Sequence, residues 1–529
     1  MRQRWPIPVV ALAALFCATF LLAGQDQQRV RDRTIQQIQR LIESQDLAGA
    51  TKLLDEAMKE FPGDSGLDNL RGVIEAQRGN RKAAETSFSR AVRRSTQFTA
   101  AYLNLGRLYQ ENSANDPQSG QKALEVYARL LEYEPSNEEA NYQSAAILLQ
   151  QGKFQESLER LSKLSEEVQG RAQALSIFCA DYAGTGNRQA ADDAAARLLA
   201  DPEFSEADAQ QVLPGATSGK RDDLAILLLE GLQKHQTLSS PLLHALGMAY
   251  ARTNRWADAR AALEKSATGK DLSVPLLLEL ARIAHQQRDY KGSLGYLAHA
   301  RDLAPENASI HYDFGLVCLD LELLAEAGNA FEKAVKLEPE NASFNYAMGS
   351  VAAFRHDPAE AVPFFQKYLQ LKPEDPRGKL ALGTALFRAK DYDAALPWLA
   401  QAVDTPDTAI AAHYYLGAIA LQQRRLDDAF SQLQLALKAK PDYTNALAEL
   451  GQYYLMQKDY AQAETYIRRA LEFDPDYLAA NLYLLTLYTR TQDSRREEQA
   501  KHFEELQKLR DEKAQELMRI VEVRPFETP

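Results

Sequence analysis

The sequence predicts an all-α solenoid of tandem helical hairpins, each 34 residues long. The chain of 529 residues has an ordinary soluble composition, with 45% hydrophobic and 25% charged residues. Several residue types recur along it at intervals of 34 positions. Self-similarity at such a period is typical of repeat proteins, in which each unit packs mainly on its neighbours.

Glycine forms the clearest column of the repeat. Twelve residues after most of these glycines stands an alanine, and a proline closes several units. The columns are Gly72, Gly106, Gly247, Gly315, Gly349, Gly383, Gly417 and Gly451; Ala327, Ala361, Ala395, Ala429 and Ala463; and Pro339, Pro373, Pro441 and Pro475. The frame predicts units that begin at 31, 65 and 99, and then every 34 residues from 138 to 478. One insertion of five residues falls within 111–120.

Residues 308–341 illustrate one unit. Apolar residues at helical spacing predict two helices, with Ile310, Phe314, Val317 and Leu321 in the first and Ala327, Phe331, Ala334 and Val335 in the second. Gly315 and Ala327 would let the two backbones approach closely, while Phe314 and Phe331 fill the space beside them. Pro339 cannot continue the second helix, and Asn341 is a good N-cap for the next one. Asn137 and Asn307 share that place, so N-capping explains all three asparagines.

This pattern resembles the tetratricopeptide repeat, over roughly residues 31–490. The resemblance implies a right-handed superhelix whose concave groove is lined by the first helices and usually holds a peptide or a partner's helix. It implies no reaction. The sequence also predicts no cofactor and no metal site, because its histidines lack metal-binding spacing. Cys179 and Cys318 are predicted to be unbridged core residues.

The N-terminus predicts export. Arg2 and Arg4 precede an uncharged run, Val9–Leu22, that ends in small residues, as in a signal peptide over residues 1–24. We therefore expect a periplasmic or secreted protein. The alternative is an uncleaved inner-membrane anchor, because 5–24 is long enough to span a bilayer.

The repeat frame divides the rest of the chain into five segments. We expect an N-terminal array at 25–205, a degenerate unit at 206–239, a C-terminal array at 240–490, a charged helix at 491–520 and a tail at 521–529. The degenerate unit places Pro214 and Gly215 inside its first helix. It is predicted either to have a kinked or shortened helix that joins two arms, or to be irregular but rigid. The charged helix is expected to cap the last hydrophobic face, with a coiled-coil site as the alternative.

Composition and motifs exclude several function classes. A net charge of −12 argues against a general nucleic-acid binder. The GDSG sequence at 63–66 is not that of a trypsin-like protease, because in that family the catalytic histidine precedes the serine, whereas the first histidine here is His235. Asp64 fits an N-cap instead. The GATSGK sequence at 215–220 has the wrong glycine spacing for a phosphate loop.

Two groups of residues are candidates for ligand contact in the groove. The fifth place of the first helices carries a tyrosine series, Tyr142, Tyr312, Tyr346 and Tyr414, which could stack on a peptide or a sugar. The alternative is that these rings serve only as packing surface. A basic cluster of His244, Arg252, Arg282 and His285 could receive a carboxylate-bearing segment, or could be solvated surface.

The predicted function is that of an exported, non-catalytic scaffold for protein–protein interaction. By analogy with bacterial envelope proteins, it would serve envelope assembly, secretion or polysaccharide export. A carbohydrate-binding solenoid that uses the tyrosines is the main alternative. An enzyme such as a glycosyltransferase is disfavoured because the repeats leave no room for a catalytic domain.

Overall fold

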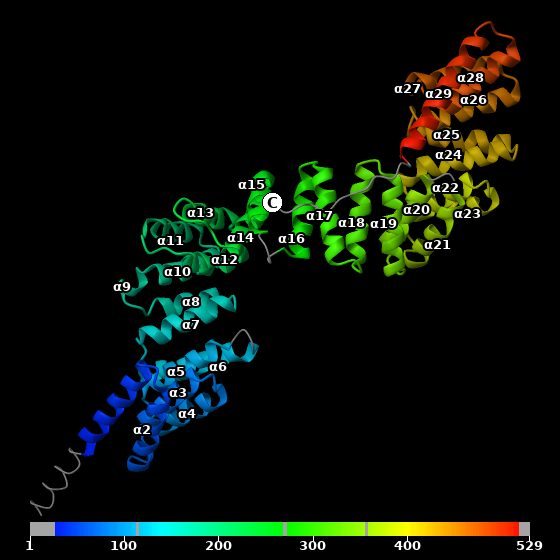
Figure 1. Ribbon diagram of the computed structural model, residues 1–529. Coiled ribbons are helices and arrows are strands. Elements are labelled where there is room, and N and C mark those ends of the chain that lie inside the picture. Colours follow the sequence, from blue (N-terminus) through cyan, green and yellow to red (C-terminus); the bar gives the residue numbers. More distant parts are fainter. Residues whose placement is uncertain (1–26, 113–115, 268–271, 355–357, 518–529) are drawn as a thin grey trace, which may run out of the picture. The chain divides into compact units, whose positions relative to one another are not determined.

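The computed structural model describes residues 27–112, 116–267, 272–354 and 358–517. Every regular element in these ranges is a helix, which confirms the predicted all-α solenoid class (Figure 1). The chain divides into two compact units, Met1–Arg255 and Trp256–Pro529. The predicted signal segment 1–24 and tail 521–529 lie outside the described residues.

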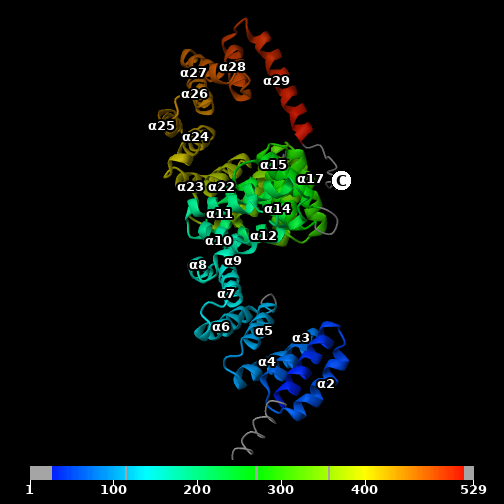
Figure 2. The same ribbon diagram turned by 90° about the vertical axis from the view of Figure 1, so that its left-hand side faces the viewer.

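The first unit contains pairs of helices that pack as hairpins (Figures 1 and 2). After the helical residues 27–43, they are α2 (Leu47–Glu60), α3 (Ser65–Gln77), α4 (Arg81–Arg94), α5 (Thr99–Gln110), α6 (Pro117–Tyr133), α7 (Glu138–Gln150), α8 (Phe154–Leu161), α9 (Glu166–Gln169), α10 (Ala172–Gly184), α11 (Arg188–Ala200), α12 (Glu206–Ser218), α13 (Asp222–Gln233) and α14 (Ser240–Arg252). The first helices α3, α5, α7, α10, α12 and α14 begin where the 34-residue frame predicts.

The second unit continues the same alternation. Its helices are α15 (Trp256–Ser266), α16 (Val274–Gln286), α17 (Tyr290–Leu303), α18 (Ala308–Asp320), α19 (Leu324–Leu337), α20 (Ala342–Phe354), the 3₁₀ helix η2 (Pro358–Ala361), α21 (Val362–Leu371), α22 (Pro376–Arg388), α23 (Tyr392–Ala402), α24 (Pro406–Gln422), α25 (Leu426–Ala439), α26 (Thr444–Gln457), α27 (Tyr460–Phe473), α28 (Leu478–Thr491) and α29 (Arg496–Leu517). Only α24 departs from the frame among the first helices of this unit, since it begins four residues early at Pro406, a residue suited to the first helical turn.

The alanine and cysteine predictions are confirmed. Ala327, Ala361, Ala395, Ala429 and Ala463 are all completely buried. The two cysteines in the described residues, Cys179 and Cys318, are free and buried as well. Small side chains at these places let the helices of each hairpin pack closely, and the stacked hairpins bury several apolar clusters between them.

The predicted helix caps are present. The side chains of Asn137, Asn307 and Asn341 accept backbone hydrogen bonds from Ala140 (3.0 Å), Ser309 (3.1 Å) and Ser343 (3.1 Å). Asp64, within the protease-like GDSG sequence, caps α3 by accepting from the backbone of Leu67 at 2.9 Å. These residues satisfy backbone groups that a helix start leaves unpaired.

The degenerate unit at 206–239 keeps a full first helix. Helix α12 has 13 residues, with Pro214 inside it, so the predicted shortening is wrong. A capping box between Ser205 and Asp208 fixes its start. The glycine at its close helix contact is Gly215, which lies outside the glycine column of the other units. A Cβ added to Gly215 would overlap the backbone carbonyl of Ala180. Helices α10 and α12 therefore touch backbone to backbone.

The division between the compact units falls at Arg255 and Trp256, inside the 240–273 hairpin. Residues 206–239 lie within the first unit. Whether they form a flexible joint stays a prediction.

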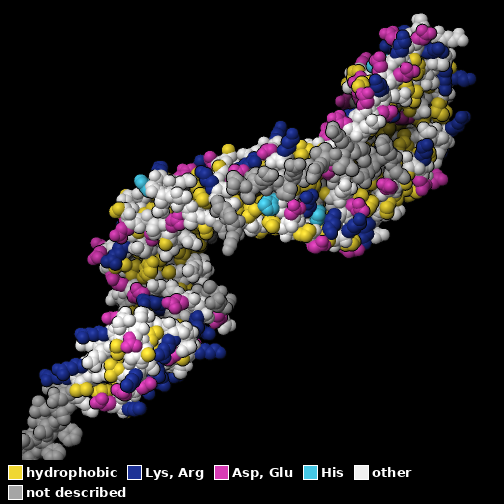
Figure 3. All heavy atoms as spheres, viewed as in Figure 1, with side chains coloured by type: hydrophobic (Ala, Val, Ile, Leu, Met, Phe, Trp, Pro, Cys, Tyr) yellow, Lys and Arg dark blue, Asp and Glu magenta, His cyan; other side chains and the backbone are white. Residues whose placement is uncertain are grey.

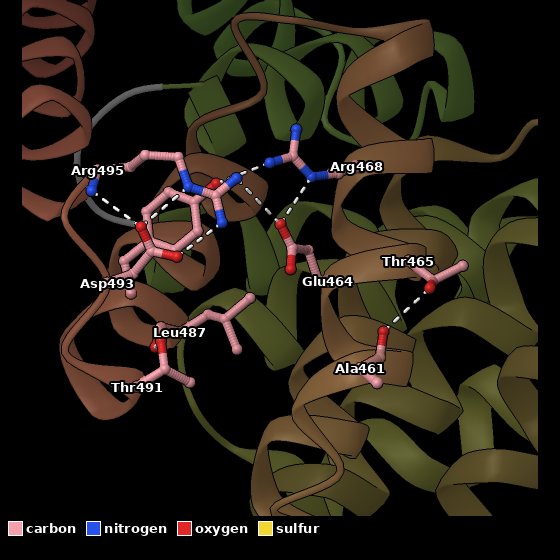
Figure 4. A network of polar contacts seen from close by, with 9 residues as sticks. Ala461, Glu464, Thr465, Arg468, Leu487, Thr491, Asp493 and Arg495 are labelled. Carbon is pink, nitrogen blue, oxygen red and sulfur yellow. Dashed lines mark hydrogen bonds and ion pairs between the residues drawn. The ribbon is translucent and has the colours of Figure 1, made fainter.

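A polar network fixes the last helices of the second unit (Figure 4). On α27, Arg468 pairs with Glu464 at 2.9 Å and donates to the hydroxyl of Tyr488 on α28 at 2.9 Å. Before α29, Arg495 pairs with Asp493 at 2.7 Å and with Glu464 at 3.4 Å, and its guanidinium lies 4.3 Å from the centre of the Tyr488 ring. Helix α29 itself buries no residue fully. Its capping role stays a prediction.

Within the described ranges, no helix combines the length and the apolar character that crossing a membrane requires.

Candidate functional site

The second unit has a cavity of about 400 Å³ between two successive first helices, α16 and α18, with α17 behind them. We call it the α16–α18 cavity. Leu278 and Leu316 form its apolar walls, and Leu297 and Val317 contribute to its floor. Leu316 is 38% exposed. The volume of the cavity lies within the range of sites that bury small ligands.

The floor of the α16–α18 cavity has no hydrogen-bonding group to spare. Ser293 is buried there, but its hydroxyl donates to the backbone carbonyl of Ala281 at 2.9 Å. A polar ligand group at the floor would lose its water without finding a partner, which is costly. The cavity therefore favours an apolar occupant.

Two basic side chains at one rim of the cavity each lie against a carboxylate. Arg282 bonds to Glu279 at 2.9 Å and lies 5.8 Å from the ring centre of Trp256. His285 lies 2.7 Å from a carboxylate oxygen of Asp320. Each basic group is thus already matched with an acid of the same unit, which reduces its attraction for a carboxylate ligand.

Asp313 forms the acidic part of the rim. Among the described residues it has no hydrogen bond or ion pair. Desolvation raises the pKa of its carboxyl above the ordinary value, and no neighbouring cation counteracts this effect.

The predicted basic cluster is divided between the two units of the chain. Arg282 and His285 line the α16–α18 cavity together. His244 and Arg252 belong to α14 in the first unit, and Arg252 pairs there with Asp222 at 2.7 Å. Contact of any of the four with a ligand stays a prediction.

The predicted tyrosine series packs mainly against protein. The Tyr312 ring centre lies 4.9 Å from that of Phe344, and the Tyr346 ring centre lies 5.0 Å from that of Tyr368. Both tyrosines are half-buried, as is Tyr142 in the first unit. Burial raises the pKa of all three hydroxyls.

Tyr414 is a correction within that series. It is only 8% exposed, because the rings of Tyr415 and Tyr443 cover it at centroid distances of 4.8 Å and 5.7 Å. It is not available to a ligand in this structure. For the other three tyrosines, ligand contact stays a prediction.

Sequence reasoning missed Leu278, Asp313 and Leu316. They were missed because a leucine at helical spacing predicts a core residue and a single aspartate predicts solvated surface. The position of each leucine within its repeat unit could have indicated the site. Leu278 holds the fifth place, which was expected to face the groove. Leu316 holds the ninth place, one helical turn further on.

Acidic and basic side chains are interspersed over the face of the molecule in Figure 3, with hydrophobic side chains between them. In the part of the chain that the structure describes, no group of three His, Cys, Asp or Glu side chains is placed to hold a metal ion.

Comparison with protein-family models identifies the repeat. One tetratricopeptide repeat model matches residues 244–308, 278–345, 312–376, 346–410 and 380–444, and a second matches 118–177 and 420–492. Together they cover more than half of the chain. The chain belongs to the tetratricopeptide repeat family. The matches follow the 34-residue frame, since the starts of successive matches of the first model are 34 residues apart.

Several solved structures are similar to this chain. YrrB, described as a TPR protein with an unusual peptide-binding site, is 23% identical, with 36% of this chain and 97% of YrrB covered at a TM-score of 0.33. The C-terminal part of a TPR repeat-containing protein from Cytophaga hutchinsonii is 16% identical, with 44% and 96% covered and a TM-score of 0.39. The Cut9–Hcn1 structure is 14% identical, with 86% and 96% covered and a TM-score of 0.37.

The family assignment rests on the repeat models and not on these structures. Comparison with curated protein sequences gives no match.

Proposed function

We propose that this tetratricopeptide repeat protein is a non-catalytic scaffold that binds a segment of another protein at the α16–α18 cavity. The observation that carries the proposal is the apolar cavity between two first helices, with Leu316 exposed at its wall. Placing an apolar side chain there removes hydrocarbon surface from water on both partners. Family membership supports a protein-binding role in general.

The mode of binding follows from the shape of the site. An apolar cavity such as this one favours an anchor side chain surrounded by weaker contacts. A short segment, extended or helical, can deliver such an anchor without a large interface.

Export is the second part of the proposal. It is supported by Arg2, Arg4 and the uncharged run Val9–Leu22. The scaffold would then act in the periplasm or outside the cell, in envelope assembly, secretion or polysaccharide export. An uncleaved anchor formed by the same segment is the alternative location.

The carbohydrate-binding alternative has less support. It relies on exposed tyrosine rings, whereas Tyr312 and Tyr346 have aromatic neighbours within 5.0 Å and Tyr414 is buried.

The test compares two leucines of similar exposure. Leu316, at the cavity, is 38% exposed, and Leu435, on the second helix α25, is 41% exposed. Partners that co-purify with the tagged protein from its native cells are quantified for wild type, Leu316→Arg and Leu435→Arg. The proposal expects Leu316→Arg to lose its main partner and Leu435→Arg to keep it. Equal recovery with both variants, after circular dichroism has verified their helix content, would contradict the proposal.

A further inference from the structure

The charges around the α16–α18 cavity do not balance. Arg282 and His285 each have an acidic partner within 3.0 Å, Glu279 and Asp320 respectively. Asp313 also lines the cavity but has no such partner among the described residues. Asp313 is therefore a cavity carboxylate that no basic group of the described residues neutralises.

Asp313 lies one helical turn before Leu316 on α18, and both residues line the same cavity. An occupant whose apolar group contacts Leu316 therefore brings its neighbouring atoms close to Asp313. Although the Asp313 side chain is exposed, partial desolvation at the cavity already disfavours its charged form and raises its pKa. An occupant that covered Asp313 without supplying a cation would add to that cost.

We infer that the α16–α18 cavity selects a peptide segment in which a large apolar residue is accompanied, within about one helical turn, by a lysine or arginine that pairs with Asp313. This inference rests on the proposed function and specifies its partner. It reverses the expectation from sequence, in which basic residues of the protein would receive an acidic segment. The overall net charge of −12 also favours basic partners at long range.

The experiment uses a random 12-residue peptide library displayed on phage, selected against the purified protein and four variants. Asp313→Asn removes the cavity carboxylate, and Leu316→Arg blocks the apolar wall. Asp302→Asn removes a similarly exposed carboxylate of α17, whose side chain is 52% exposed and pairs with Arg301. Leu435→Arg controls for an added arginine elsewhere.

The inference expects wild type to enrich peptides that contain a large apolar residue with a lysine or arginine within four positions. Asp313→Asn should keep the apolar preference and lose the basic one. For a selected basic peptide, its dissociation constant should rise roughly three- to tenfold with Asp313→Asn and remain unchanged with Asp302→Asn. Added salt should weaken binding to wild type more than binding to Asp313→Asn.

Two results overturn the inference in distinguishable ways. If the enriched peptides depend on Leu316 but have neutral or acidic neighbours, or if Asp313→Asn and Asp302→Asn behave alike, the partner chemistry is wrong while the proposed function stands. If wild type enriches nothing beyond what Leu316→Arg enriches, while Leu435→Arg matches wild type, the cavity is not the binding site and both proposals fail.

Discussion

The ring of Phe331 lies directly against the backbone of Gly315. A Cβ atom added to Gly315 would stand 2.5 Å from the Cε1 atom of that ring. Phe331 is completely buried and cannot swing away. The same relationship recurs between Gly349 and Phe365, where the distance is 2.9 Å. Each of these two glycines thus creates the space that an aromatic ring of the second helix fills.

Gly315→Ala is therefore expected to destabilise α18 and α19. Overpacking of this kind costs about 1–3 kcal/mol. Hydrogen exchange of the α18 and α19 amides should speed up and the melting temperature should fall. The control is Gly120→Ala in α6, where the nearest atoms lie 3.6 Å from the added Cβ. A melt unchanged by Gly315→Ala would contradict the helix contact described here.

An added methyl group should destabilise the contact between α10 and α12 more than the contact between α18 and α19. At Gly215 an added Cβ overlaps the backbone oxygen of Ala180, whereas at Gly231 in α13 it meets only the methyl end of Leu199, a residue 37% exposed. Gly215→Ala is expected to cost about 2–4 kcal/mol because the backbone cannot yield locally. Gly231→Ala should be neutral or stabilising, since alanine favours helix. Chemical denaturation of both variants tests this contrast, and equal effects would contradict it.

A substitution in the turn between the two helices of a unit is expected to stabilise the protein. Lys458 has a φ of 63°, and the equivalent place in earlier units holds Gly79, Gly152 and Gly186 with φ between 72° and 81°. Left-handed backbone is strained for a residue with a side chain. Lys458→Gly is expected to stabilise the protein by about 0.5–1 kcal/mol, net of the greater flexibility of glycine. Gly152→Lys is the reverse control and should destabilise by a similar amount.

Glu449 should make the stability of the second unit depend on pH. It is 8% exposed, its carboxylate lies 3.0 Å from the hydroxyl of Tyr483, and burial raises its pKa from 4.5 to about 7. A folded pKa above the unfolded one means that the protonated acid is favoured by folding. The protonated Glu449 side chain therefore contributes fully to stability below about pH 4.5, and this contribution is lost as the pH rises to about 7.

Glu449→Gln should accordingly match wild type near pH 4 and be more stable above pH 7, on the order of 1–3 kcal/mol. Thermal melts from pH 4 to pH 9 measure the difference. Glu472→Gln, which removes an exposed carboxylate from α27, controls for net charge. A constant offset between Glu449→Gln and wild type at all pH values would rule out ionisation of Glu449 as the cause.

Periodicity predicted most of the fold because one hairpin geometry recurs. Glycine, alanine and proline each perform the same steric task in successive units, so their columns located the helices nearly to the residue. The irregular α12 was harder, because its close contact moved from the usual glycine place to Gly215 and its partner, Ala180, lies on the first helix of the preceding unit. The 34-residue frame contains no information about such a contact.

The site was less predictable because exposure and pairing depend on neighbours. Tyr414 holds the same place in its unit as Tyr312, yet Tyr415 and Tyr443 cover it. Arg282 was predicted to belong to a basic cluster, but it pairs with Glu279 on its own helix. These differences arise from particular neighbouring side chains, some on the same helix and some on another, which a single position in the repeat does not reveal.

The most direct test of the proposed binding site is site-specific photo-crosslinking. p-Benzoylphenylalanine is placed at residue 316 or at residue 435 of the full chain, and the native cells are irradiated. The account predicts one reproducible covalent partner at position 316 and little or none at position 435, two sites of comparable exposure. Equal crosslinking at both positions, or a partner captured only at 435, would contradict it.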